Sequence, residues 1–171
     1  QGIAIKNLLL WDIKRFFPEE YEVGVNALKM VQKRVGMELS TDEAGFIALH
    51  LVNAEMEEEV GNIYELTKLM QEITNIVKYY FKVSFDEDSV YFYRFSTHLK
   101  FFCYRLLHQR EVVENDDEEL YAVIKKKYLN AYRCVEKISL YLNENYDYQV
   151  SNEERLYLTI HIARIVQTTE Q

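Results

Sequence analysis

Two arginines flank a histidine in the segment RFSTHLKFFCYR, which begins at Arg94. Arg94 lies four residues before His98 and Arg105 seven residues after it, so a helix would place all three side chains on one face. Nearby positive charge lowers a histidine pKa and favours neutral imidazole, the form that can attack phosphorus. The same arginines could then bind the new phosphoryl group through charge-assisted hydrogen bonds. The pattern predicts a phosphoryl acceptor, although solvated helix faces often carry such residues as well.

Two further histidines occupy matching places in a repeated segment. The segments STDEAGFIALH and SNEERLYLTIH end at His50 and His161, and in both the histidine follows a glutamate by seven residues. Each histidine could be a core-edge residue whose ring is satisfied by its neighbours. Their recurrence at equivalent positions favours a functional role, although a shared structural role would also preserve it. His108 has no visible equivalent and is interpreted as an exposed residue at a helix end.

Other kinds of chemistry find little support in the sequence. His98, Cys103 and His108 are spaced by five residues, which turns successive side chains away from one another, so they cannot converge on one metal ion from a single helix. The sequence has no HExxH, CxxC or GxSxG motif and no glycine loop that could cradle a phosphate. The acidic residues form no convincing acid–base pair. We therefore expect a protein that is not an enzyme and that needs no metal or cofactor.

The composition indicates long helices rather than strands. The chain has 171 residues, of which 49% are hydrophobic, yet only five are glycine and one is proline. Turns between strands usually draw on these two residue types, so their scarcity favours helices. The net charge of −8 argues against a nucleic-acid-binding face, which is normally basic.

The cysteines and the hydropathy pattern predict a cytoplasmic protein. Cys103 and Cys134 lie within apolar helical patterns, which favours buried, reduced thiols over a disulfide. No apolar run is long enough to span a bilayer, and no signal peptide is visible.

Apolar residues repeat at spacings of three and four along most of the chain, which predicts an all-α fold. The expected helices are 3–16, 20–36, 41–57, 62–81, 87–109, 117–143 with a possible break near 127, and 152–168. Capping signals, in which a short polar side chain is followed three residues later by glutamate, suggest helix starts at Ser40–Glu43, Ser84–Glu87, Asn115–Glu118 and Ser151–Glu154.

The repeat extends upstream of the histidine segments and predicts two domains. The helix beginning at Tyr21 aligns with the one beginning at Tyr128, which gives a duplication with a period of about 110 residues. Residues 62–171 form one complete unit, whereas residues 1–60 match only the latter part of another, with Glu57–Gly61 as the expected linker. The first unit is thus expected to be truncated at its N-terminus by about fifty residues. Its helices would then pack against the second unit or a partner chain.

Three separated motifs resemble one known family. DEAGFIALHLVNAE (Asp42–Glu55), YRFSTHLKFF (Tyr93–Phe102) and LYLTIHIARIV (Leu156–Val166) are similar to the regulatory half of LicT- and BglG-type transcriptional antiterminators. The resemblance covers nearly the whole chain, and the motifs follow the expected order. It implies tandem phosphotransferase-system regulation domains (PRDs), each a compact helical bundle with two phosphorylatable histidines.

The resemblance also implies roles for individual residues. His98 and His161 would be the two acceptors of the second PRD, and His50 the second acceptor of the first. Arg105 matches the arginine that follows the first histidine of each PRD motif. Many relatives carry an aspartate eight residues before the second histidine. Asp42 keeps this residue in the first unit, and Glu153 replaces it in the second with the same charge on a longer side chain, so both are candidate histidine-orienting carboxylates.

The implied partners follow from the family mechanism. The phosphocarrier protein of the sugar phosphotransferase system would phosphorylate the second PRD, and a sugar-specific permease the first. Phosphorylation would shift a homodimer, and an RNA-binding domain upstream of the chain would respond.

Three alternatives stay open. The PRDs could belong to a DNA-binding transcriptional activator, whose upstream domain would be a helix-turn-helix. The chain could be a metal-dependent helical-bundle enzyme that uses His98 and His161. It could also be a helical scaffold whose histidines are inert.

Overall fold

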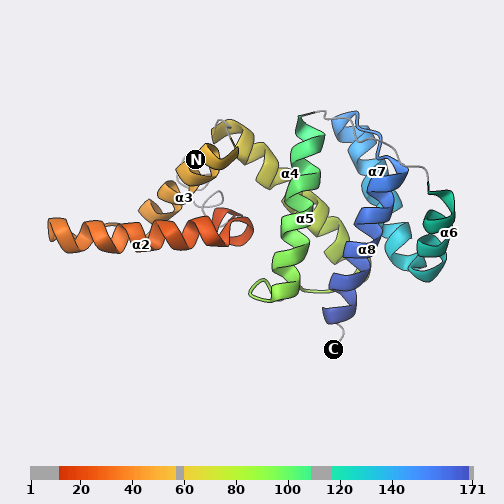
Figure 1. Ribbon diagram of the computed structural model, residues 1–171, viewed down its shortest axis with the longest axis horizontal. Coiled ribbons are helices and arrows are strands. Elements are labelled where there is room, and N and C mark those ends of the chain that lie inside the picture. The colour runs from red at the N-terminus through yellow and green to blue at the C-terminus, as the bar shows by residue number, and fades with distance from the viewer. Residues whose placement is uncertain (1–11, 57–59, 109–116, 170–171) are drawn as a thin grey trace. The chain divides into compact units, whose positions relative to one another are not determined.

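The chain folds into helices throughout the part that the structure describes. The computed structural model describes residues 12–56, 60–108 and 117–169, and within these ranges it contains no strand (Figure 1). Residues 12–16 of the predicted helix 3–16 are helical, and the rest of that predicted helix lies outside the described residues. The remaining helices are α2 (Pro18–Val35), α3 (Asp42–Met56), α4 (Val60–Phe81), α5 (Val90–Leu107), α6 (Glu118–Lys127), α7 (Leu129–Tyr146) and α8 (Asn152–Thr169). The predicted all-α class is confirmed.

Most predicted helix boundaries hold to within a few residues, and the possible break near residue 127 is real. Helix α6 ends at Lys127 and α7 begins at Leu129. The predicted cap at Ser84 is wrong, because α5 begins only at Val90 and the Ser89 hydroxyl accepts the hydrogen bond from the backbone N–H of Phe92 at 3.1 Å. A turn closed by the Ser89 N–H and the Asp86 carbonyl precedes this cap.

Two compact units divide the chain, residues 1–68 and residues 69–171, which we call unit 1 and unit 2. The boundary between them falls within α4. Residues 57–59 of the predicted linker lie outside the described residues. Val60 and Gly61, also predicted to belong to that linker, are helical.

Unit 1 contains a close pair of helices, α2 and α3. Gly24 of α2 permits their approach, because a Cβ atom at this position would lie 2.3 Å from the carbonyl oxygen of Ala44. Helix α2 ends at Gly36, which adopts a left-handed φ of 70° and donates its N–H to the carbonyl oxygen of Gln32.

The two copies of the sequence repeat differ in how much of one helix they bury. The repeat aligns Val31 and Val35 of α2 with Ile138 and Leu142 of α7. Ile138 and Leu142 are 0% exposed, whereas Val31 is 45% and Val35 is 59% exposed. Within the described residues, therefore, an apolar face of α2 is exposed in unit 1, whereas the corresponding face of α7 is buried in the core of unit 2.

Helix α8 is the central packing partner of unit 2, since it contacts α5, α6 and α7. Figure 1 shows α5 and α8 lying side by side. The core of unit 2 is filled by apolar side chains from α4, α5, α7 and α8, whereas α6 contributes no buried residue. These side chains are Leu69, Met70, Ile73, Val77, Phe92, Phe95, Leu99, Phe102, Cys134, Val135, Ile138, Leu142, Leu158, Ile162 and Ile165. This packing fixes the rotation of α5 and α8, and with it the direction of the side chains along their seam.

Candidate functional site

Two of the predicted histidines meet at the seam between α5 and α8. The ring centroids of His98 and His161 lie 3.8 Å apart, and their planes are inclined by 26°, so the imidazoles are stacked. Both side chains are half-buried. Their sequence neighbours Leu99 and Ile162 are buried in the core, which holds each histidine at the rim of the helix interface. The structure thus brings together two residues that lie 63 positions apart in the sequence.

Tyr157 completes this cluster, and the sequence reasoning missed it. Its hydroxyl oxygen lies 2.5 Å from Nδ1 of His98. Its ring packs edge-on against both imidazoles, at centroid distances of 5.4 Å from His98 and 4.5 Å from His161. Tyr157 precedes His161 by one helical turn, so the two side chains share a face of α8.

Burial keeps both imidazoles neutral at neutral pH. The pKa of His161 is lowered to about 4, first by burial and then by the nearby His98 and the positive charge of Arg164. The pKa of His98 is also lowered, again first by burial and then by Arg164. Both rings therefore retain a nitrogen lone pair at pH 7, which is what a phosphoryl acceptor requires.

The arginines are arranged differently from the prediction. Arg94 is exposed on α5, and the guanidinium that acts on both histidines belongs to Arg164, three residues after His161 on α8. Arg105 is half-buried, and its buried Nε–H has no hydrogen-bond partner among the residues that the structure describes. Its positive charge lowers the pKa of Tyr157 against the larger effect of burial. Positive charge is therefore present at the site. Of the two predicted arginines, only Arg105 shifts the pKa of a residue in the cluster, and Arg164 supplies the charge that acts on the histidines.

The predicted carboxylates lie away from the histidines of their own helices. Asp42 and Glu153 are exposed near the starts of α3 and α8. Eight residues separate each from the histidine that follows, which is about 12 Å along a helix axis. The side chain that does hydrogen-bond one of the stacked histidines is Tyr157, which bonds His98.

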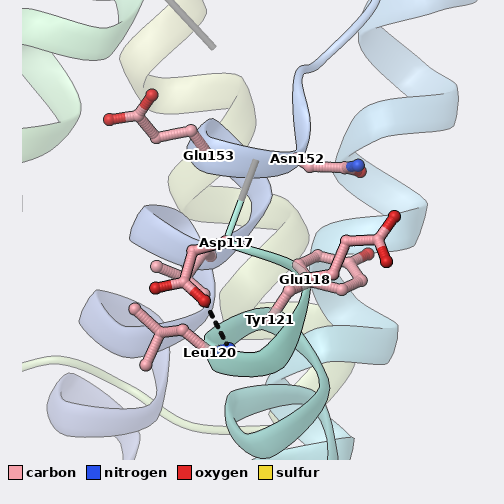
Figure 2. Close-up of a pocket in the computed structure, with 7 residues that line it drawn as sticks. Asp117, Glu118, Leu120, Tyr121, Asn152 and Glu153 are labelled. Carbon is pink, nitrogen blue, oxygen red and sulfur yellow. Dashed lines mark hydrogen bonds between the residues drawn. The ribbon is translucent and has the colours of Figure 1, made fainter. Parts of the chain in front are cut away.

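Glu153 instead lines a pocket between the starts of α6 and α8. Figure 2 shows this pocket, in which Asp117 accepts a hydrogen bond from the backbone N–H of Leu120. The pocket has a volume of about 240 Å³. It is lined by Asp117, Glu118, Leu120, Tyr121, Asn152, Glu153 and Leu156, and contains none of the histidines. Asp117 is the N-cap of α6, so the cap predicted at Asn115, a residue outside the described ranges, is wrong.

The structure also describes the other two histidines of the chain. His50 is exposed on α3 of unit 1. His108 lies at the C-terminal end of α5, as predicted, but it is half-buried rather than exposed. Its ring stacks on Tyr104 at 4.1 Å, with Nδ1 2.7 Å from the Tyr104 carbonyl oxygen.

Neither a metal centre nor a membrane span was found in the described ranges. Among residues 12–56, 60–108 and 117–169, no three His, Cys, Asp or Glu side chains are grouped so that they could hold a metal ion. Within the same ranges, no helix has the length and apolar character that crossing a bilayer requires.

Unit 2 should lose stability as the pH falls from 6.5 toward 4. An unfolded histidine titrates near 6.5, whereas folding lowers the pKa of His161 to about 4. Between these values the unfolded chain binds a proton that the folded chain does not, so this contribution is fully present above pH 6.5 and is lost below it. Urea denaturation at about pH 7 and about pH 5 should show a smaller loss for His161→Gln than for the natural chain. Equal losses would contradict this assignment.

Comparison with known proteins supports the resemblance. The family model described as PRD domain matches residues 1–54 and 71–165. The chain is 50% identical over 166 residues to the transcription antiterminator LicT of Bacillus subtilis (strain 168), covering 97% of this chain and 60% of that protein. It is 46% identical over 165 residues to the beta-glucoside operon antiterminator of Dickeya chrysanthemi, covering 96% of this chain and 58% of that protein. It is also 27% identical over 165 residues to the PtsGHI operon antiterminator of Bacillus subtilis, with the same shares covered.

Proposed function

This chain belongs to the PRD domain family, and we propose that it is the regulatory region of a transcriptional antiterminator controlled by phosphorylation of its histidines. It spans about 60% of the length of the LicT antiterminator and of the beta-glucoside operon antiterminator described above. RNA binding is accordingly assigned to a domain outside this chain. The names of these relatives support antitermination over a DNA-binding activator.

The stacked pair of His98 and His161 carries the proposal. Each ring is half-buried and neutral at pH 7, so each has a lone pair that can attack phosphorus. The donor for this pair is the phosphocarrier protein of the sugar phosphotransferase system. His50 of unit 1 is exposed and so open to a second donor, the sugar-specific permease.

Phosphorylation would place charge where the fold now disfavours it. A phosphoryl group adds about −1.5 to −2 charge at neutral pH, by analogy with phosphorylated hydroxyl residues. The ring centroids are only 3.8 Å apart, so the bulky and strongly hydrated group on one ring would crowd the other ring, and we expect the stack to rearrange. Two arginines can bind it: Arg164, whose charge acts on both histidines, and Arg105, whose charge acts on Tyr157 and whose Nε–H has no partner within the described residues.

This rearrangement is the proposed switch. Moving α5 against α8 alters the surface of unit 2, and a change of a few kcal/mol is enough to shift how two chains pair. The homodimer then determines whether the upstream domain binds RNA.

Labelling by the phosphotransferase system tests the proposal. The chain should be incubated with phosphoenolpyruvate, the general phosphotransferase enzyme and the phosphocarrier protein, and acid-labile phosphate then mapped to peptides. We expect label on the peptides that contain His98 or His161, and its loss from both in the His98→Ala, His161→Ala double variant. The His108→Ala variant is the matched control and should keep the label. Label that is absent from the natural chain, or that survives in the double variant at His108, would refute the proposal.

A further inference from the structure

The two ring nitrogens of His98 have different surroundings. Nδ1 is engaged with the Tyr157 hydroxyl at 2.5 Å. Within the described residues, no hydrogen bond occupies Nε2. His161 differs, because its ring makes stacking contacts but no side-chain hydrogen bond in the same part of the chain.

We propose that Tyr157 is a positioning residue that holds His98 in its Nδ1–H tautomer and thereby makes Nε2 the atom that accepts the phosphoryl group. This inference rests on the proposed function and specifies its chemistry. Tyr157 is suited to the task because it sits on α8, packs edge-on against both imidazoles, and so fixes the plane of the His98 ring from the opposite helix.

Only one arrangement of the Tyr157–His98 hydrogen bond leaves a usable nucleophile. If Tyr157 donates its O–H to Nδ1, the His98 proton lies on Nε2, and the remaining lone pair on Nδ1 is covered by the hydroxyl. Neither nitrogen could then attack phosphorus. If Nδ1–H donates to the tyrosine oxygen, the Nε2 lone pair is free.

The transfer step balances with no further reactant. Nε2 of His98 forms a bond to phosphorus while the bond between phosphorus and the nitrogen atom of a phosphoramidate-type donor group breaks; the proton that the donor takes up goes to this nitrogen or its ring. The Nδ1 proton of His98 becomes acidic and leaves through its hydrogen bond to the Tyr157 oxygen toward solvent, while the donor takes up one proton. The net exchange is one phosphoryl group for one proton. The Tyr157 hydroxyl stays protonated at neutral pH, because burial raises its pKa.

The tautomer can be read directly by NMR of the full chain labelled with ¹⁵N-histidine. In the natural chain we expect His98 to show a protonated Nδ1 and a lone pair on Nε2. Tyr157→Phe keeps the ring but removes the hydroxyl, so the tautomers should mix. Tyr79→Phe, which alters an 81% exposed tyrosine of the same unit, is the matched control and should leave His98 unchanged. If NMR shows that His98 of the natural chain is protonated on Nε2, the inference is overturned, whatever the variants show.

The phosphorylated product provides the second readout. Phosphoramidate, a small donor that needs no docking surface, should give the Nε2 isomer at His98 of the natural chain. In Tyr157→Phe the ratio of Nε2 to Nδ1 isomer should fall by about 10-fold, as expected for the loss of one orienting hydrogen bond. An unchanged ratio would overturn the inference. If phosphoramidate gives the Nε2 isomer but the loaded phosphocarrier protein gives no label, the proposed function fails while the role of Tyr157 stands.

Discussion

Replacing Glu154 with alanine should destabilise unit 2 by about 2–4 kcal/mol. The Glu154 side chain is only 3% exposed, and its carboxylate accepts hydrogen bonds from the Tyr148 hydroxyl at 2.8 Å and from the backbone N–H of Ser151 at 3.1 Å. The Ser151 hydroxyl in turn accepts the Glu154 N–H at 3.2 Å, which completes a reciprocal cap at the start of α8. Alanine would leave the Tyr148 and Ser151 donors without their acceptor.

The adjacent residue provides the control for this prediction. Glu153 is exposed on the same helical turn, so Glu153→Ala should change the free energy of unfolding by no more than about 0.5 kcal/mol. Glu154→Gln keeps an acceptor oxygen and should fall between the two. Urea denaturation of the three variants checks the order. Equal stability of Glu154→Ala and Glu153→Ala would contradict the role assigned to the cap.

Replacing Gly24 with alanine should destabilise unit 1 by about 3 kcal/mol. The new Cβ would lie 2.3 Å from the carbonyl oxygen of Ala44 and 3.3 Å from the backbone nitrogen of Ala48. Both are backbone atoms of α3, which cannot rotate away as a side chain can, so α2 and α3 would have to separate. In an unobstructed helix the same change would instead stabilise by about 1 kcal/mol, because alanine has the higher helix propensity.

Gly36 provides the matched control in the same unit. A Cβ at Gly36 would meet nothing within 4 Å, so Gly36→Ala should cost only the left-handed φ of 70°, about 1–2 kcal/mol. Hydrogen exchange of the α2 and α3 amides resolves unit 1 from unit 2 and gives both values. Protection in Gly24→Ala equal to or above that of the natural chain would show that the close approach is not a constraint.

Local pattern predicted the helices well because their apolar spacing is a local property. The break between α6 and α7 was visible near Lys127, and the repeat identified α2 and α3 as counterparts of α7 and α8. The predicted start of α5 was too early because the residues after Ser84 form a turn in which the Ser89 hydroxyl bonds the Asp86 carbonyl, and Ser89 then caps the helix.

The site was only half predictable, because it depends on packing between helices distant in sequence. His98 and His161 could be selected one by one, yet nothing local predicts that the packing of α5 on α8 stacks their rings. Tyr157 and Arg164 carried a signal that could have been used, since they lie four residues before and three residues after His161 and share its helix face. The arginines predicted from the sequence are instead neighbours of His98, and one of them, Arg94, is exposed.

Sedimentation before and after phosphorylation tests most directly whether charge on the His98–His161 pair controls how two chains associate. The natural chain, loaded enzymatically with phosphate, should show a dimer dissociation constant at least about 10-fold different from that of the unloaded chain, as expected from a change of about 1.4 kcal/mol or more. The His98→Ala, His161→Ala variant, treated identically, should show no change. If the natural chain takes up phosphate at these histidines and its dissociation constant does not move, the proposed switch is contradicted.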